Sequence, residues 1–297
     1  MPADSVNILP GPLYHRMEPR IALSRRVNNL QFTISYDRTS QFFHLLANSS
    51  VGLPTDIWMP SGRNIKPQNC NIYAIGYETK INKWVPSISL FYKDFFNTTD
   101  FKDNANLFLN KYVESQLLQR AGKAYGMELS MQKKSGIFTG LMSYTLSKTF
   151  NRIEGVNEGK EYPSRYDKRH NLSATGKFDF SKKIQASFNF VYTTGGAITV
   201  PAGNFVFDGV VFNYYTSRNS YRLPDYHRLD MSLKYSPSAN MKRKYKSAWS
   251  FDLYNAYGRK NPFTVFSMQS DYGLTNTGIK ALYLFRVVPS VAYSFTF

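Results

Sequence analysis

The last residues of the chain alternate between large apolar and small side chains, and this constrains the fold more than any other feature of the sequence. Side chains of a β-strand point alternately to opposite faces, so a period of two predicts a strand with one apolar and one polar face. Such a strand suits a sheet with lipid on one side and a polar lumen on the other. The apolar positions are Val291, Tyr293, Phe295 and Phe297, and the small ones are Ser290, Ala292, Ser294 and Thr296.

The same period recurs along the chain in eleven segments. Within 124–133, for example, Tyr125 and Met127 oppose Gly126 and Glu128. The segments are about ten residues long, which is the length that a tilted strand needs to cross a bilayer. We expect strands near 19–26, 30–38, 71–80, 85–95, 124–133, 137–149, 169–180, 184–193, 227–235, 247–256 and 284–297.

The connections between these segments alternate in length. An antiparallel up-and-down sheet places all short turns at one edge and all long loops at the other, as in outer-membrane barrels with periplasmic turns and external loops. The last strand then runs from the outside to the periplasm. Short connections lie near 27–29, 81–84, 134–136 and 181–183, with a longer one at 236–246, and long connections lie near 39–70, 96–123, 150–168, 194–226 and 257–283.

Composition excludes several classes of protein. No run of 18 apolar residues occurs and the mean hydropathy is -0.39, which argues against a helical membrane protein. The single cysteine, Cys70, excludes an intrachain disulfide and a cysteine-rich zinc site. The aromatic content of 16% suits a transmembrane barrel or a β-sandwich binding module. Residues 1–20 contain prolines and no apolar core, so we expect no signal peptide in this stretch.

The formal net charge of +17 is concentrated at the predicted turn edge, and without the basic residues there it falls to +5. We expect rings at headgroup depth and ammonium groups that reach lipid phosphates. The alternative is a set of solvated, lysine-rich turns. A nucleic-acid surface would mix aromatic and basic residues on one exposed face, so we expect no nucleic-acid partner. The basic residues are Arg25, Arg26, Lys80, Lys83, Lys133, Lys134, Lys182, Lys183, Lys242, Arg243, Lys244 and Lys246, and the expected anchors are Lys83, Trp84, Lys134, Lys182, Lys183 and Trp249.

No motif for catalysis, cofactor binding or metal binding is present, and no ligand-binding residue can be named. The segment 161–170 is dense in ionisable groups, and a catalytic interpretation would pair Asp167 with His170. The alternative, which we favour because no nucleophile lies beside the pair, is a loop that folds back onto a strand through local ion pairs. In 194–226, Asp208 and Gly209 separate two apolar runs and predict a β-hairpin.

Several blocks together resemble the C-terminal half of the β-barrel of TonB-dependent outer-membrane receptors, of the type common in Bacteroidetes. The end of the chain is similar to the insertion signal that the barrel-assembly machinery reads, with Tyr293, Phe295 and Phe297 as its aromatic positions. The blocks are Glu18-Pro19-Arg20, 49–56, 122–129, 143–147, Tyr162-Pro163-Ser164-Arg165-Tyr166-Asp167 with 168–170, and 253–262.

The resemblance implies import of a scarce nutrient through a 22-stranded outer-membrane barrel, with a plug domain and a TonB-contacting box. Residues 1–297 would form one barrel segment without signal, box or plug, so TonB would act only through the missing part. Eleven strands do not close into an antiparallel barrel, because the first and last run in the same direction. We therefore expect an all-β, up-and-down transmembrane segment, an open curved sheet if alone, with outer-membrane lipid, the assembly machinery and the missing half as partners. The alternatives are a small self-standing porin or adhesin, in which residues 1–18 add a strand, and a soluble all-β binding module.

Overall fold

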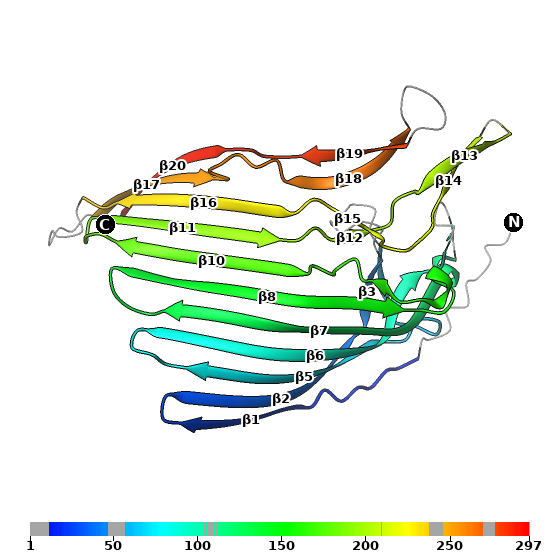
Figure 1. The fold of residues 1–297 in the computed structure, drawn as a ribbon, viewed down its shortest axis with the longest axis horizontal. Coiled ribbons are helices and arrows are strands. Elements are labelled where there is room, and N and C mark those ends of the chain that lie inside the picture. The colour runs from blue at the N-terminus through cyan, green and yellow to red at the C-terminus, as the bar shows by residue number, and fades with distance from the viewer. Residues whose placement is uncertain are drawn as a thin grey trace, which may run out of the picture.

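The computed structural model describes residues 12–46, 57–103, 105, 110, 112–208, 210–237, 246–269 and 277–296. One large antiparallel sheet dominates, and its strands lie in space in the order in which they occur in the chain (Figure 1). Each of the eleven expected segments corresponds to one of its strands. They are β1 (Arg20–Val27), β2 (Leu30–Gln41), β5 (Gln68–Thr79), β6 (Trp84–Phe101), β7 (Leu117–Lys133), β8 (Phe138–Arg152), β10 (His170–Asp179), β11 (Ile184–Thr193), β16 (Tyr226–Tyr235), β17 (Lys246–Tyr254) and β20 (Val288–Thr296).

The sheet is open. β1 and β20 form its two edges and are not paired with each other. Because every neighbouring pair along the sheet is antiparallel and the number of strands is odd, the two edge strands run in the same direction. This confirms the fold class expected from the sequence, a segment of an up-and-down barrel with open edges.

The register carries the alternation of each strand across the whole sheet. On one face, Ser87, Ser130, Ser143 and Ser173 lie side by side on four neighbouring strands, and the hydroxyl oxygens of Ser87 and Ser130 are 2.8 Å apart. We call this the inner face, because the concavity described below lies on it. The outer face carries the large apolar side chains, many of them exposed, including Ile75, Leu90, Met142, Phe251 and Val291.

Within the described residues, no second layer covers the outer face, and the one compact apolar cluster lies away from the middle of the sheet. That cluster joins Ile153, Val156 and Tyr162, with Leu118 packed against it. A soluble sandwich would bury its apolar face against a second sheet. An uncovered apolar face of this extent suits lipid.

Tight turns join the strands at one end of the sheet, the turn end, where the last strand also finishes (Figure 1). Asn28, Asn82 and Gly136 supply the positive φ angles of 54°, 55° and 115° that three of these turns need. The sorting of short and long connections expected from the sequence is therefore confirmed.

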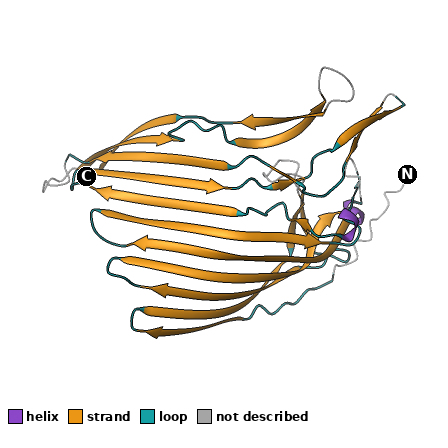
Figure 2. Cartoon of the chain, in the orientation of Figure 1, coloured by secondary structure: helices purple, strands orange, loops and turns teal. Residues whose placement is uncertain are grey.

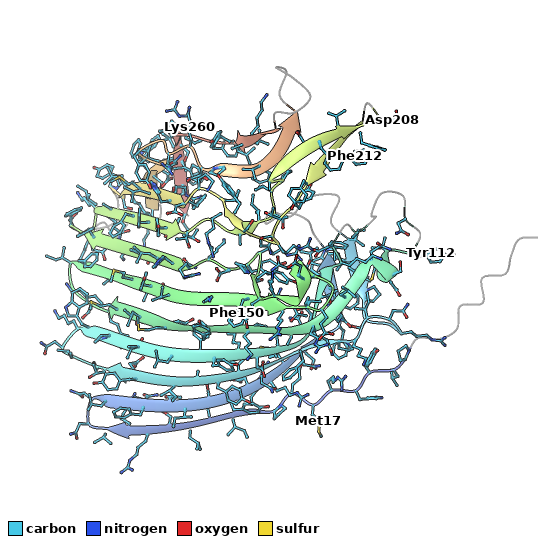
Figure 3. The ribbon with its side chains drawn as sticks, turned by 45° about the vertical axis from the view of Figure 1, so that its right-hand side comes forward. Met17, Tyr112, Phe150, Asp208, Phe212 and Lys260 are labelled. Carbon is cyan, nitrogen blue, oxygen red and sulfur yellow. The ribbon has the colours of Figure 1, made fainter. Side chains whose placement is uncertain are left out.

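The opposite end, the loop end, carries the short elements (Figure 2). The expected hairpin forms, with Asp208 at its turn, and it projects away from the large sheet (Figure 3). No helix in the described ranges has the length and apolar character to cross a bilayer. The short elements are β3 (Phe43–Leu46), β4 (Ile57–Pro60), β9 (Tyr162–Pro163), β12 (Ala197–Ile198), β13 (Gly203–Phe207), β14 (Val210–Tyr214), β15 (Tyr221–Arg222), β18 (Pro262–Gln269), β19 (Thr277–Tyr283) and the 3-10 turns η1 (Val113–Gln116) and η2 (Asn157–Gly159).

Candidate functional site

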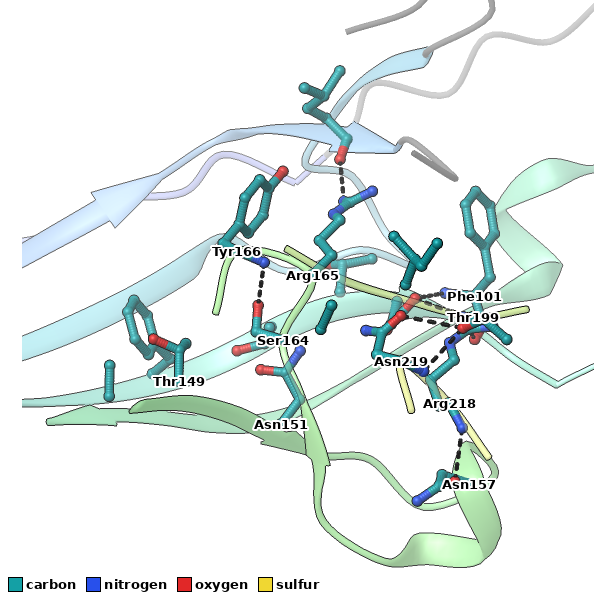
Figure 4. Close-up of a pocket in the computed structure, with 18 of the residues that line it drawn as sticks. Phe101, Thr149, Asn151, Asn157, Ser164, Arg165, Tyr166, Thr199, Arg218 and Asn219 are labelled. Atoms are coloured by element: carbon teal, nitrogen blue, oxygen red, sulfur yellow. Dashed lines mark hydrogen bonds and ion pairs between the residues drawn. The ribbon is translucent and has the colours of Figure 1, made fainter. Parts of the chain in front are cut away.

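A concavity of about 1090 Å³ lies on the inner face at the loop end. Its floor is the part of β6, β7 and β8 that lies toward the loop end. Its walls come from the β3–β4 hairpin, the 153–169 loop and the 194–225 loop (Figure 4). Hydroxyl and amide side chains dominate the lining, including Thr149, Asn151, Ser164, Thr199 and Asn219. The site therefore presents many hydrogen-bonding groups on a rigid sheet.

A β-bulge in β6 brings Asp100 to this concavity. The pairing with β7 shifts between Phe95 and Thr98, and Asn97 has a φ of 58°. One extra residue on β6 reverses the alternation beyond it, so that Asp100 lies on the same face as Phe95. The side-chain amide of Asn97 donates to the carbonyl of Pro67 at 3.0 Å, which ties the bulge to the preceding strand.

Arg218 of the 194–225 loop binds the end of β6, 118 residues earlier in the chain. Its Nη2 atom donates to Oδ1 of Asp100 at 2.7 Å and to the carbonyl of Phe101 at 2.9 Å. Its backbone N–H donates to Oδ1 of Asn157 at 3.0 Å. We call this group the Asp100 clasp. It holds the loop inward as a wall of the concavity.

Tyr162 completes the Asp100 clasp from the sheet side. It is 1% exposed, and its hydroxyl donates to Oδ2 of Asp100 at 2.9 Å. Burial, followed by the negative charge of Asp100, raises the pKa of Tyr162, so the phenol stays protonated and remains a donor. Asp100 is thus bonded through both carboxylate oxygens.

A second group, the Asp167 clasp, fixes the base of the same loop. Asp167 is 1% exposed, and its Oδ1 accepts the backbone N–H of Thr149 at 2.7 Å. The Arg222 guanidinium bonds to Oδ2 of Asp167 and donates to the Asp167 carbonyl at 2.8 Å. Arg169, whose side chain is 44% exposed against 33% for Arg222, lies 3.9 Å from the same carboxylate. The buried charge is therefore paired and hydrogen-bonded, as burial requires.

Asp225 joins the two ends of the 194–225 loop, which we call its neck. Its carboxylate accepts the Tyr192 hydroxyl at 2.7 Å and the backbone N–H of Gly195 at 3.1 Å. The hydrogen bond from Tyr192 lowers the pKa of Asp225 and keeps it charged. A Cβ atom at Gly195 would overlap the backbone of Leu223, so the close approach of the two sides of the neck needs glycine.

Some charged side chains of the concavity are bonded to other protein groups, and others form no ion pair among the described residues. Asp100 is bonded within its clasp, and Oδ2 of Asp103 accepts the N–H of Asn157 at 2.7 Å. Among the described residues, Lys93, Lys102 and Glu128 line the concavity without an ion pair within 4 Å. The described ranges contain no group of three histidine, cysteine, aspartate or glutamate side chains that could hold a metal ion. The arrangement can bind a polar ligand through hydrogen bonds and charge.

The structure separates the pair that a catalytic interpretation would use. Asp167 is enclosed by its clasp. His170 instead forms a hydrogen bond between its Nδ1 atom and the Tyr144 hydroxyl, at 2.7 Å. The 153–169 loop does fold back, because β9 pairs with β8. The Arg222 partner of Asp167 comes from a different loop, 55 residues away, so the contacts are less local than we expected.

The six residues expected to act as anchors lie at the turn end. Trp84 starts β6, and the Lys133 ammonium lies 5.3 Å from the centre of its indole ring. Trp249 packs against Tyr293 with ring centroids 4.7 Å apart. Lys83, Lys134, Lys182 and Lys183 occupy the turns between β5 and β6, β7 and β8, and β10 and β11. Phe297 and residues 242–244 lie outside the described residues, whereas Phe295 is 64% exposed on β20.

Sequence reasoning did not identify the residues that build the concavity. Asp100 lies beyond the expected end of its strand, and Arg218 and Arg222 lie in a loop with no recognisable motif. The one available signal was the density of ionisable and aromatic residues in 161–170, which contains both Tyr162 and Asp167. That density marked the segment, but not its partners.

Comparisons with known proteins agree with this architecture. A family model described as TonB dependent receptor-like, beta-barrel matches residues 17–273. No curated protein matches the chain.

Among solved structures, the chain is similar to the ferric-catecholate import receptor Fiu from E. coli, with 15% identity, a TM-score of 0.57, and coverage of 95% of this chain and 35% of that one. It is also similar to the ferripyoverdine receptor of Pseudomonas aeruginosa, with 14% identity, a TM-score of 0.55, and coverage of 94% and 32%. The ferric preacinetobactin receptor BauA of Acinetobacter baumannii gives 13% identity, a TM-score of 0.57, and coverage of 98% and 38%.

At these identities the structural matches show a shared fold, and the chain spans about a third of the length of the receptors that it matches. The family model covers most of the chain, and the open, two-faced meander has the architecture that the family description names. The chain belongs to the TonB-dependent receptor-like β-barrel family.

Proposed function

We propose that this chain is part of the outer-membrane wall of a receptor that imports a scarce nutrient in a TonB-dependent way. The observation that carries the proposal is the continuous sorting of side chains across eleven strands, apolar outside and polar inside. A wall of this kind separates lipid from a polar passage. The receptors with similar folds are named for ferric compounds, and one of them, Fiu, is named as an import receptor, which supports a transport role.

We further propose that the wall is completed by an N-terminal barrel half that also carries the plug and the contact with TonB. β1 and β20 run in the same direction, so antiparallel closure needs an odd number of additional strands with both edges running the opposite way. A second copy of this chain would meet those edges in parallel. Free edges are not tolerated in lipid, which makes such a complement necessary for a stable membrane form.

The turn end supplies the proposed membrane contacts. Six residues would anchor the periplasmic rim, with their ammonium groups at lipid phosphates and their rings at the interface. They are Lys83, Trp84, Lys134, Lys182, Lys183 and Trp249. Tyr293, Phe295 and the terminal Phe297 would be read by the barrel-assembly machinery. Conversion of these four lysines to glutamine should weaken association of the refolded chain with anionic micelles more than with neutral ones.

The concavity is the proposed place of substrate contact, and its hydrogen-bonding lining suits recognition and passage of a polar nutrient without chemical conversion. We propose no enzymatic role and no nucleic-acid partner. In this scheme the clasps hold the 194–225 loop as a fixed wall beside the path of the substrate.

The test is the location and size of the native product. An antibody against the β17–β20 region should detect, in the outer-membrane fraction of the source cells, a protein much larger than 34.2 kDa. Deletion of the coding region should abolish uptake of one nutrient that also requires TonB. A product of 34.2 kDa confined to the soluble fraction would contradict the proposal.

A further inference from the structure

A row of four tyrosines crosses the outer face about midway along four strands. Tyr36, Tyr73, Tyr92 and Tyr125 are direct cross-strand partners on β2, β5, β6 and β7. The first two rings have centroids 5.3 Å apart, and the second and third are 6.5 Å apart. Three of the four are recorded as exposed, namely Tyr73, Tyr92 and Tyr125. Amphipathic rings in such a row mark the boundary between hydrocarbon and headgroups.

Two lysines lie beside the β7 end of this row, one level with it and one further toward the loop end. Lys148 is the cross-strand partner of Tyr125, and Lys123 is the partner of Phe150. Lys123 precedes Tyr125 by two residues and Lys148 precedes Phe150 by two, so all four side chains share the outer face. The lysines are diagonal neighbours, which places their Cβ atoms roughly 7 Å apart. Both lysines are exposed.

An aromatic pair supports Lys148. The Lys148 ammonium lies 5.4 Å from the centre of the Phe150 ring, and that ring meets Tyr125 edge-on at 6.2 Å. A lysine stem that lies along an aromatic surface at the interface carries its ammonium toward the headgroups. The two cations thus lie on adjacent strands, Lys148 level with Tyr125 and Lys123 two residues further toward the loop end.

The charged neighbours leave the pair positive. The row that contains Lys123 continues through Asp94 and Asn71 to Arg38, all cross-strand neighbours on the outer face. Asp94 is the only carboxylate in that row, and neither lysine has an ion pair within 4 Å among the described residues. On the far side, the His170 ring is engaged by Tyr144.

We propose that Lys123 and Lys148 bind the phosphate group of a lipid headgroup in the outer leaflet of the membrane. The proposal rests on the membrane placement given under Proposed function. It concerns the side of the sheet toward the loop end, opposite the turn-end lysines. It follows from two cations on adjacent strands that are spaced to share one phosphate, one level with the tyrosine row and the other one step beyond it.

The experiment uses the full chain refolded in nonionic detergent micelles doped with phosphatidic acid or with diacylglycerol, which differ only in the phosphate. Lys83, Lys134, Lys182 and Lys183 are glutamine throughout to reduce turn-end binding, and the remaining basic residues of the turn end are the same in every variant. Each basic residue near a membrane surface contributes to the binding free energy. We therefore expect the affinity for phosphatidic acid to fall about fivefold in K123Q or K148Q and roughly 30-fold in the double variant.

Two controls isolate the site. Lys93 pairs with Ala124 and therefore lies at nearly the same height as Lys123 but on the inner face, so K93Q should change the affinity less than about twofold. The double variant K123R/K148R keeps both charges and should retain binding. Inorganic phosphate added at the lipid concentration should not compete if the site is a lipid site.

The outcomes separate the two proposals. Unchanged affinity in K123Q/K148Q, equal binding of the two lipids, or competition by inorganic phosphate would overturn the headgroup site while leaving the membrane wall intact. A chain that does not associate with micelles of either kind would overturn the membrane placement itself. The expected result is a phosphate-dependent affinity that is lost with both lysines and restored by arginine.

Discussion

The two ends of the strands are held together by contacts of different range. Within the turns, side-chain hydrogen bonds join residues close in sequence, such as Arg26 with Gln31 or Lys183 with Ser181, and neighbouring hairpins meet there through backbone bonds and ring contacts. At the loop end, Arg222 binds Asp167 across 55 residues and Arg218 binds Asp100 across 118. The turn end is therefore encoded locally, whereas the loop end depends on the whole sheet being in place.

This difference matches what each end does. Turns need only short, repeated signals, because their task is to reverse the chain at a membrane surface. The loop end must build a concavity of defined shape, and shape requires buried, mutually bonded groups from distant segments. Single substitutions should therefore have larger and more distant effects at the loop end.

The largest effect is expected for Arg222→Ala, because it leaves the buried carboxylate of Asp167 without its main cation, at a cost of about 3–5 kcal/mol. Hydrogen–deuterium exchange in micelles should accelerate in 195–225 and 160–168, with no change in the turn at 180–183. Arg169→Ala is the matched control, because Arg169 approaches the same carboxylate from an exposed position and should cost less than about 1 kcal/mol. Equal effects of the two variants would show that Arg222 is not the main cation that stabilises Asp167.

Tyr162→Phe should be next, because it deletes a buried hydrogen bond to a charged acceptor and keeps the ring, at a cost of about 1.5–3 kcal/mol. Exchange should increase at the junction of β8, β9 and the 213–222 segment. Tyr166→Phe, four residues along the same loop and 60% exposed, should change local stability by less than about 0.5 kcal/mol. A Tyr162→Phe variant with wild-type protection would show that the Asp100 clasp holds without its phenol.

At the turn end, Gly136→Ala should cost about 1–2 kcal/mol, because the φ of 115° is unfavourable for any residue with a Cβ atom. The effect should stay within the β7–β8 hairpin and be read as faster amide exchange on either side of this turn. Gly62→Ala, where a Cβ would meet no atom within 4 Å, should be nearly neutral. Spread of the Gly136 effect into the concavity would contradict the local character of the turn end.

The smallest effect is a pH dependence of the β3–β4 hairpin. Burial lowers the pKa of His44, although a backbone hydrogen bond with Lys66 acts in the opposite direction. The unfolded chain takes up this proton near pH 6.5, so the hairpin has its full stability above about pH 6.5 and loses it progressively as the pH falls. Fluorescence of Trp58, which lies opposite Leu45 in the hairpin, should report the loosening.

His44→Gln should remove this pH dependence. The turn end supplies the internal control, because histidine occurs only at positions 15, 44, 170 and 227, and none of these lies in a turn. Exchange in the turns should therefore stay flat between about pH 5 and 8 once intrinsic exchange rates are divided out. A turn end that loosens in the same pH range would assign the effect to the sheet as a whole.

Much of the sheet could be predicted from the sequence, because its signals are short-range. Alternation in 124–133 or 184–193 involves neighbouring residues only, and Asp208 with Gly209 marks its hairpin without help from the rest of the chain. The extensions of β6 to Phe101 and of β7 back to Leu117 were missed. The bulge near Asn97 reverses the alternation there, so the pattern that defines the strand is interrupted before the strand ends.

The sequence by itself determined a wall with an apolar and a polar face, short turns at one end and long loops at the other. Strand alternation and turn chemistry are properties of adjacent residues, and lipid on one face makes the alternation strict. Only the tertiary structure decided that Asp100 meets Tyr162 and Arg218, that Asp167 meets Arg222, and that these two clasps hold the wall of one concavity. These pairs lie 55, 62 and 118 residues apart in the chain, and a short pattern of adjacent residues does not specify contacts over such separations.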